Sequence, residues 1–273
     1  MRFTKSLTLA AFAAAAVSAI PAQAADPIFT ALPTNPAGWV ATVKGTFQVG
    51  PSYPGADDMD FVAFPSLSFR RAGTPERYGA PDDGLSFSFV EQSALTIGFV
   101  GRFQGGRYLK NDRRLFGLEK INWAIEPGLF LEYWPVEFLR ARAEIRHGIN
   151  GHDGFVADLG LDVVQRYGAF TVSVGPRLAL GDSSFTRTYF GVTPYEALVN
   201  GQVTAYRPSG GLTSVGVTSG LTYDWSDQWS TTGFVSYKRL VGDAADSPIV
   251  KRFGSENQLG LGLTASYSFD SGM

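Results

Sequence analysis

The feature that most constrains this chain is a strict alternation of charged and apolar residues along one segment, residues 139–146. Successive side chains of an extended strand point to opposite faces, so this segment has one apolar face and one face made entirely of charges. The segment that follows, residues 155–164, alternates in the same way and places two aspartates on its polar face. The charges on these two polar faces are Arg140, Arg142, Glu144, Arg146, Asp158 and Asp162.

Two neighbouring antiparallel strands with these patterns would bring the basic row opposite the acidic pair. A transmembrane barrel presents an apolar outside to lipid and a polar inside to its lumen, and its closure satisfies every backbone hydrogen bond. We therefore predict an all-β protein, a transmembrane antiparallel β-barrel; the alternative is a secreted soluble β-sandwich. The charged rows would either line a pore selective for anions or zwitterions, or form ion pairs that fill and stiffen a narrow lumen.

Period-two alternation recurs along most of the chain, in segments of about 9 to 13 residues that suit a tilted transmembrane strand. We count eleven such segments. Bacterial single-chain barrels have even strand numbers, so we expect twelve strands, with residues 28–32 as a short additional one and ten or fourteen as alternatives. The eleven segments lie at residues 39–49, around Pro65, and at 85–89, 95–100, 122–133, 139–146, 155–164, 170–178, 215–221, 235–237 and 258–269.

The connections between these segments fall into two length classes. Outer-membrane barrels have short periplasmic turns and longer external loops, so we assign the long connections to the outside of the cell. Aromatic residues gather beside the short connections, as in an interfacial girdle. The short connections are 91–93, 134–138, 167–168 and 224–228, and the long ones are 71–84, 108–121, 148–153, 181–209 and 241–256.

The first 24 residues have the pattern of a signal peptide. Arg2 and Lys5 precede an apolar run at residues 7–20, and Ala22-Gln23-Ala24 matches the small-x-small pattern of a cleavage site. The alternative is a membrane anchor, but the run is shorter than the roughly 20 residues that a helical span needs. We therefore expect a cleaved signal peptide at 1–24, followed by an outer-membrane β-barrel domain at 25–273.

Composition excludes several other classes of protein. The chain has no cysteine, which excludes disulfide scaffolds and thiolate metal sites. Its formal net charge of −2, without a basic run, argues against a nucleic-acid partner. After residue 24 there is no stretch of about 18 consecutive apolar residues, so a helical membrane span is not expected.

Chemistry-bearing residues are few. Two histidines, His147 and His152, lie beside Asp153, and we favour loop residues over a hydrolytic set. Asp57, Asp58 and Asp60 could attract a divalent cation, but their spacing does not match a calcium loop, and a solvated acidic turn is favoured. No metalloprotease, serine-hydrolase or phosphate-loop motif is present. We expect no catalytic residue, no cofactor and no metal site.

Several ordered motifs give the chain a resemblance to a known family. The most specific is the block Arg239-Leu240-Val241-Gly242-Asp243-Ala244-Ala245-Asp246-Ser247-Pro248-Ile249. It is preceded by Pro51-Ser52-Tyr53-Pro54-Gly55 and by Tyr189-Phe190-Gly191-Val192, and followed by the glycine-rich strand at 259–269. In this order the motifs resemble the MipA/OmpV family of outer-membrane proteins, the MltA-interacting protein family.

The resemblance implies a scaffold that docks periplasmic peptidoglycan-remodelling enzymes, a lytic transglycosylase and a murein synthase. It also leaves open a porin-like channel for small solutes, or an adhesin that acts through its external loops. The family defines no catalytic residues. We expect a monomer in contact with outer-membrane lipid, and a basic loop, Lys110, Arg113, Arg114 and Lys120, that could bind lipopolysaccharide phosphates. The candidate loop or partner surface comprises Tyr53, Gly55, Asp243, Asp246, Ser247 and Pro248.

Overall fold

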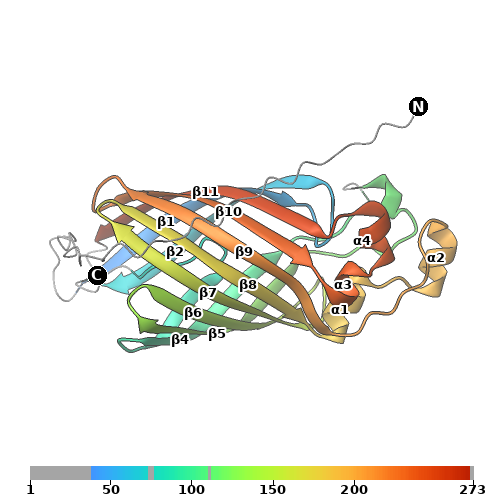
Figure 1. Ribbon diagram of the computed structural model, residues 1–273, viewed down its shortest axis with the longest axis horizontal. Coiled ribbons are helices and arrows are strands. Elements are labelled where there is room, and N and C mark those ends of the chain that lie inside the picture. Colours follow the sequence, from blue (N-terminus) through green and yellow to red (C-terminus); the bar gives the residue numbers. More distant parts are fainter. Residues whose placement is uncertain (1–37, 73–76, 110–111, 271–273) are drawn as a thin grey trace, which may run out of the picture.

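The computed structural model describes residues 38–72, 77–109 and 112–270. The expected signal peptide, 1–24, and the expected additional strand, 28–32, lie outside these residues. Eleven strands form one antiparallel sheet that curls into a nearly closed barrel (Figure 1). Their bounds are β1 Trp39–Pro51, β2 Met59–Arg71, β3 Leu85–Glu91, β4 Leu95–Gln104, β5 Ala124–Val136, β6 Leu139–His147, β7 Phe155–Tyr167, β8 Phe170–Gly181, β9 Gly211–Asp224, β10 Trp229–Leu240 and β11 Asn257–Asp270.

This architecture confirms the predicted antiparallel barrel. Each of the eleven alternating segments of the sequence corresponds to one strand among the described residues. In the sheet the strands follow the order β2-β1-β11-β10-β9-β8-β7-β6-β5-β4-β3. A twelfth strand is not among the residues that the structure describes.

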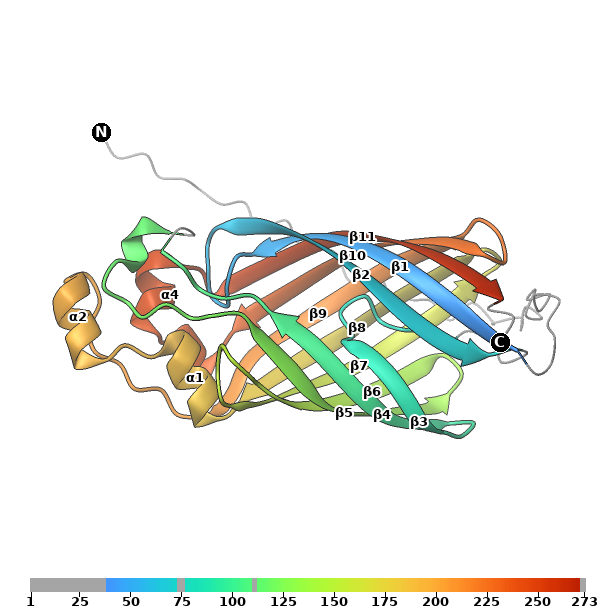
Figure 2. The ribbon, with the colours of Figure 1, turned by 180° about the vertical axis from the view of Figure 1, so that it is seen from behind.

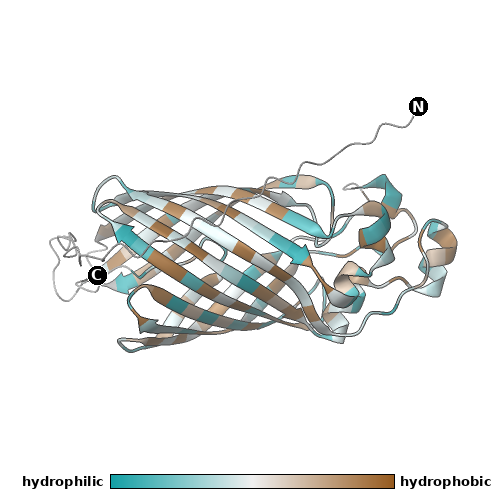
Figure 3. Ribbon diagram, viewed as in Figure 1, coloured by the Kyte–Doolittle hydropathy of each residue, from teal (hydrophilic) through white to brown (hydrophobic). Residues whose placement is uncertain are grey.

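The alternating residues of each strand point to the outer and the inner surface of the barrel in turn. On β11, Leu259, Leu261 and Leu263 are each about half exposed on the outer surface. On the inner surface Thr42 and Ser268 are buried, and their hydroxyls form a hydrogen bond of 2.8 Å between β1 and β11. Brown and teal residues accordingly alternate along the strands in Figure 3. An apolar outer surface of this kind is what a lipid environment requires.

The two edges of the sheet, β2 and β3, do not pair with each other among the described strands (Figure 2). Ten antiparallel pairings separate them, so β2 and β3 run in the same direction. β2 ends beside the start of β1. β3 begins opposite Gly101, near the end of β4, which lies at the opposite end of the barrel. The chain between β2 and β3 must therefore travel back along the barrel.

The two ends of the barrel differ. At one end, the short-turn end, the turns β3–β4, β5–β6, β7–β8 and β9–β10 contain between two and four residues. At the other, the longer connections carry the 3₁₀ helix η1 and four α-helices (Figure 1). We call these helices and their connections the helical cap. They are η1 Arg113–Leu115, α1 Ser183–Phe190, α2 Pro194–Asn200, α3 Gly242–Ala245 and α4 Pro248–Phe253.

The helices of the cap were not expected from the alternation, but their starts carry local signals. Asp182 precedes α1 and accepts a hydrogen bond from the Phe185 N–H at 2.9 Å. Thr193 and Glu196 form a reciprocal capping box at α2, with Pro194 in its first turn. Such side chains satisfy backbone N–H groups that a helix start leaves unpaired. No helix in the described part of the chain is both long and apolar enough to cross a membrane.

Candidate functional site

The centre of the lumen is a network of buried ion pairs. Arg140 on β6 is fully buried and lies 2.8 Å from Glu132 Oε2 on β5 and 2.9 Å from Asp162 Oδ2 on β7. It also pairs with Asp83. The register of the sheet sets this geometry, because Arg140 stands directly opposite Asp162. One guanidinium thus joins two strands and one connecting segment.

The network continues towards the helical cap. Arg142 Nε lies 2.9 Å from Glu144 Oε1, and Arg146 Nε lies 3.0 Å from Glu126 Oε2. Arg146 also pairs with Asp158. The structure therefore brings all six predicted lumen charges onto the inner wall, where each has an opposite charge as partner.

Several members of the network were not among the predicted site residues. Glu126, Glu132 and Arg177 occupy polar positions of alternating strands, so the same pattern could have found them. Arg102 lies on β4, with its Nη2 3.1 Å from Glu144 Oε2. Breaking a buried pair by removing one partner costs roughly 3–5 kcal/mol, because the other charge is left uncompensated. The network therefore holds the inner wall in one arrangement.

A segment of chain, residues 77–84, lies inside the lumen, and we call it the lumen plug (Figure 2). The Asp82 carboxylate accepts hydrogen bonds from Arg177 on β8 and from the Thr218 hydroxyl on β9, at 2.9 Å each. Its backbone carbonyl accepts one from Arg102 on β4 at 2.9 Å. Contacts to the neighbouring strands β8 and β9 and to β4, which three strands separate from β8 in the sheet, fix the plug within the barrel.

The assignment of residues 71–84 to an external loop was therefore wrong. The other long connections do lie together at the helical end. This one begins at the short-turn end, because Arg71 pairs with Trp39 at the start of β1, and its residues 77–84 return through the lumen. The acidic pair Asp82 and Asp83 explains why this connection enters the lumen. The two carboxylates form ion pairs there with Arg177 and Arg140 of the inner wall, with a directional geometry that water does not provide.

The plug leaves little open space at its own level. The cavity lined by Asp82, Arg140 and Arg177 measures about 30 Å³. This space has room for a few water molecules at most, and we call it the constriction. Above it, towards the helical cap, a second cavity of about 290 Å³ opens between the plug and the cap. We call this second cavity the chamber.

The residues expected to form a partner surface are mostly inside the cap. Tyr53 is 3% exposed, Ser247 is fully buried, and Gly55 is buried against Val250 at the backbone angle φ +92°. Burial raises the pKa of the Tyr53 hydroxyl to about 12, so it stays neutral. These three residues therefore lie in the interior of the cap, Tyr53 within its apolar core, and none of them presents its side chain on the surface.

The remaining residues of that predicted surface hold the cap together or lie at its edge. Asp243 accepts hydrogen bonds of 2.6 Å from both the backbone N–H and the hydroxyl of Ser209, which joins two connections. These bonds lower the pKa of its carboxyl. Asp246 is exposed and pairs with Lys251 at 2.7 Å, and Pro248 begins α4. In the structure the block contains α3 and the start of α4, and a partner-binding role for its residues stays a prediction.

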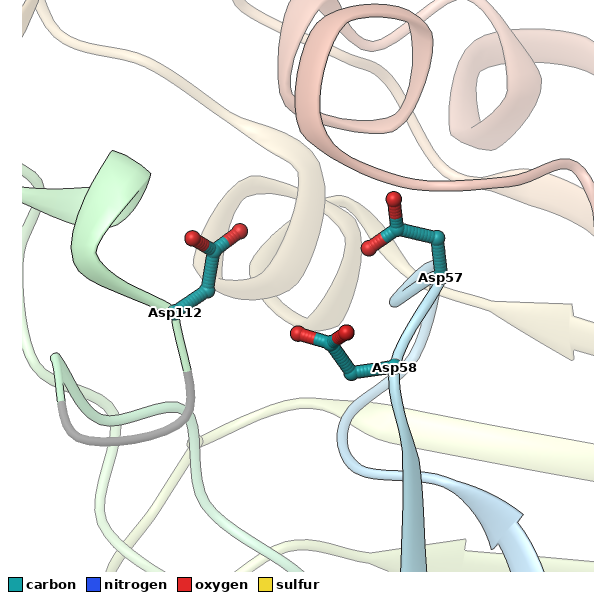
Figure 4. Close-up of side chains that lie close together, drawn as sticks. All are labelled: Asp57, Asp58 and Asp112. Atoms are coloured by element: carbon teal, nitrogen blue, oxygen red, sulfur yellow. The ribbon is translucent and has the colours of Figure 1, made fainter.

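An acidic cluster lies on the outside of the cap (Figure 4). It joins Asp57 and Asp58 with Asp112, and not with Asp60, whose carboxylate accepts the Phe61 N–H. Arg114 lies 2.8 Å from Asp57 and 2.7 Å from Asp112. Because this guanidinium already pairs with two of the three carboxylates, we interpret the cluster as an ion-pair group of the cap.

The two histidines serve different contacts. His152 Nε2 lies 3.0 Å from Glu126 Oε1, and its buried ring packs edge-on against Phe185 and Tyr189. His147 Nε2 lies 3.1 Å from Asp153 at the surface. Within the described ranges neither imidazole hydrogen-bonds to a serine hydroxyl, so no hydrolytic set is assembled there.

The basic loop is partly engaged within the protein. Arg114 belongs to the acidic cluster, and the Lys120 ammonium lies 5.4 Å from the centre of the Tyr108 ring. Arg113 is exposed on η1, and Lys110 lies outside the described residues. Contact of this loop with lipopolysaccharide stays a prediction.

An antiparallel barrel with an apolar outer surface and a charged, plugged lumen defines an outer-membrane β-barrel protein. The family model described as MltA-interacting protein MipA matches residues 44–269, so the chain belongs to this family. The outer membrane protein OmpV of Vibrio cholerae is 31% identical over 209 residues, which cover 71% of this chain and 74% of OmpV. Omp26La of Vibrio anguillarum is 32% identical over 147 residues, 54% of this chain, and the match spans about half (51%) of that relative.

The structures to which this chain is similar include solved outer-membrane proteins. An outer membrane channel from Pseudomonas putida F1 has a TM-score of 0.44 at 11% identity, covering 89% of this chain and 99% of that chain. The KdgM porin has a TM-score of 0.37 at 10% identity, covering 85% and 99%. Neither likeness bears on what this chain transports or binds.

Proposed function

We propose that this protein is an outer-membrane scaffold that docks a periplasmic peptidoglycan-remodelling enzyme and has no catalytic role of its own. The match to the MltA-interacting family over residues 44–269 carries the proposal. The partners it implies are a lytic transglycosylase and, through it, a murein synthase. Such a role needs an anchored, rigid body and no open pore.

The lumen supports an anchoring role over passive transport. The constriction beside the plug is about 30 Å³, and the arginines and carboxylates around it are held in ion pairs. A porin-like channel would need the plug to leave. We therefore expect little ion conductance from the purified protein in a planar bilayer. Discrete conductance steps from the wild-type protein would contradict this part of the proposal.

The docking face would be the short-turn end, because outer-membrane barrels place their short turns in the periplasm. Glu137 and Asp227 are exposed on two of these turns. A photo-crosslinking amino acid at either position should capture a lytic transglycosylase in cells. The matched control carries the crosslinker at Tyr195 in the cap. The proposal would be overturned if the crosslinker captured a murein enzyme only from Tyr195. It would also be overturned if the crosslinkers at Glu137 and Asp227 captured neither a lytic transglycosylase nor a murein synthase.

A second candidate, adhesion through the external end, is favoured by an apolar tip on the cap. Tyr195 and Leu198 on α2 are 74% and 80% exposed, and Phe116 lies exposed near them. Clustered exposed apolar residues mark interaction surfaces. The change of Tyr195 and Leu198 to serine should then reduce attachment of cells to host-cell monolayers without unfolding the barrel. Unchanged attachment would end this candidate.

A further inference from the structure

The chamber between the lumen plug and the helical cap contains polar groups that the protein itself does not use. On its wall formed by β5, β6 and β7 each charge has a partner, because Arg146 pairs with both Glu126 and Asp158. Glu126 is shared further with His152 at 3.0 Å. No charge on this wall is left over for a ligand.

The opposite wall is different. Lys238 on β10 lines the chamber, and among the described residues its ammonium has no ion pair and no hydrogen bond. Two more polar residues line the chamber, Ser236, two residues earlier on the same face, and Gln48 on β1. Within the described part of the chain their side chains also have no hydrogen-bond partner. The Nε of Arg102, which also lines the chamber, is buried without a hydrogen-bond partner.

One cation of the lining has no ion pair. Arg102 and Arg146 both pair with Glu144, so Lys238 is the cation of the lining that has no ion pair among the described residues. Asp82, which shares the neighbouring constriction with Lys238, is already held by Arg177. An ammonium group without an ion pair is stabilised by an anion placed beside it.

The cap supplies an apolar side to the same chamber. Phe185 and Phe190 of α1 line it, together with Leu240 at the end of β10. A cavity of about 290 Å³ with aromatic surface and a few convergent polar groups is the usual form of a small-molecule site. The ligand must therefore combine one negative charge with a compact apolar part.

We propose that the chamber binds a small carboxylate with a ring or short aliphatic body. Its carboxylate accepts hydrogen bonds from Lys238, Gln48 and Ser236, and its apolar part lies against α1. This site is separate from the proposed docking face at the short-turn end, so each can fail without the other.

The test uses benzoate as the probe and the purified full chain in nanodiscs of uncharged lipid, with binding followed by titration calorimetry and ligand-observed NMR. Benzoate should bind saturably at one site, and benzyl alcohol, which keeps the ring and loses the charge, should bind more weakly. Lys238→Gln should weaken benzoate binding about tenfold or more, because a charge-assisted hydrogen bond is lost.

Lys44→Gln is the matched control. Lys44 shares the inner face of β1 with the buried residues Thr42 and Thr46, but it does not line the chamber. Both variants should keep the heat-modifiable migration of a folded barrel. Absence of saturable benzoate binding, equal binding of benzyl alcohol, or an equal loss in Lys44→Gln would each overturn the proposal.

Discussion

The Asp82 carboxylate accepts two hydrogen bonds from the Arg177 guanidinium, 2.9 Å from Nε and 3.0 Å from Nη2. This bidentate pair joins a connecting segment to the wall of β8, 95 residues further along the chain. Two parallel N–H to carboxylate bonds fix both distance and orientation. The plug is therefore attached to the barrel by a directional contact, in addition to filling space.

Neutralising the plug should open the lumen. In a variant with Asp82→Asn and Asp83→Asn, the ion pairs of the plug with Arg177 and Arg140 are lost, which removes the charged contacts that hold the plug in the lumen. We expect discrete conductance levels in a planar bilayer where the wild type stays near the baseline. Glu256→Gln, which breaks the exposed pair with Arg239, is the control and should stay silent. A folded double variant that is equally silent would refute the role of the plug.

The buried network should contribute far more to stability than the ion pairs of the cap. Arg140→Met leaves Glu132, Asp162 and Asp83 without their shared cation, and should lower the free energy of unfolding by roughly 3–5 kcal/mol. Arg114→Met, which removes a solvent-exposed pair, should cost about 1 kcal/mol or less. Urea unfolding of protein in lipid vesicles measures both. Equal costs would mean that the lumen is as wet as the surface.

The outer face can be tested with a charge. Leu263 lies near the middle of β11 and is 52% exposed on the apolar surface. Leu263→Arg should destabilise the barrel by about 2–4 kcal/mol, because a charge near the bilayer midplane loses its hydration. Leu198→Arg, on the exposed face of α2, should change stability by less than about 0.5 kcal/mol. Urea unfolding in lipid vesicles measures both changes. A smaller loss of unfolding free energy for Leu263→Arg than for Leu198→Arg would mean that the outer face has been assigned wrongly.

The capping box of α2 should weaken in acid. Burial opposes ionisation of Glu196, but hydrogen bonds of 2.7 Å from the backbone N–H groups of Thr193 and Glu119 lower the pKa of its carboxyl below 4.5. A carboxyl with a lowered folded-state pKa stabilises fully above its unfolded value and loses this stabilisation as pH falls through the folded value.

Amide hydrogen exchange measures this effect. The protection factors of the Thr193 and Glu119 amides should fall as the pH drops below about 4.5, the ordinary pKa of the carboxyl. In Glu196→Gln, which has no proton to gain there, protection should stay nearly constant over the same range. The same fall in both proteins would show that another group controls the cap.

Much of the wall could be predicted from the sequence. The inner position of Arg140 and Asp162 and the outer position of Leu261 follow from period-two alternation, which is a local property of an extended chain. Their contact follows too, since hairpin neighbours in an antiparallel barrel pair directly. The capping box of Thr193 and Glu196 was also visible, because its spacing of three residues is a local signal.

The plug and the cap could not be predicted in this way. Pro81-Asp82-Asp83-Gly84 has the composition of a turn on either side of a membrane, and only its partners on β4, β6, β8 and β9 place it in the lumen. Tyr53 and Ser247 lie in connections, and their burial depends on contacts with segments far away in the chain.

The sequence by itself determined which faces of the strands meet lipid and which carry charge, because each face is fixed by residues two apart. The tertiary structure alone decided that the edges β2 and β3 run in the same direction, that residues 77–84 lie in the lumen, and that Lys238 has no ion pair among the described residues. These outcomes depend on which charges meet across the barrel, and that is settled only when all the strands are in place.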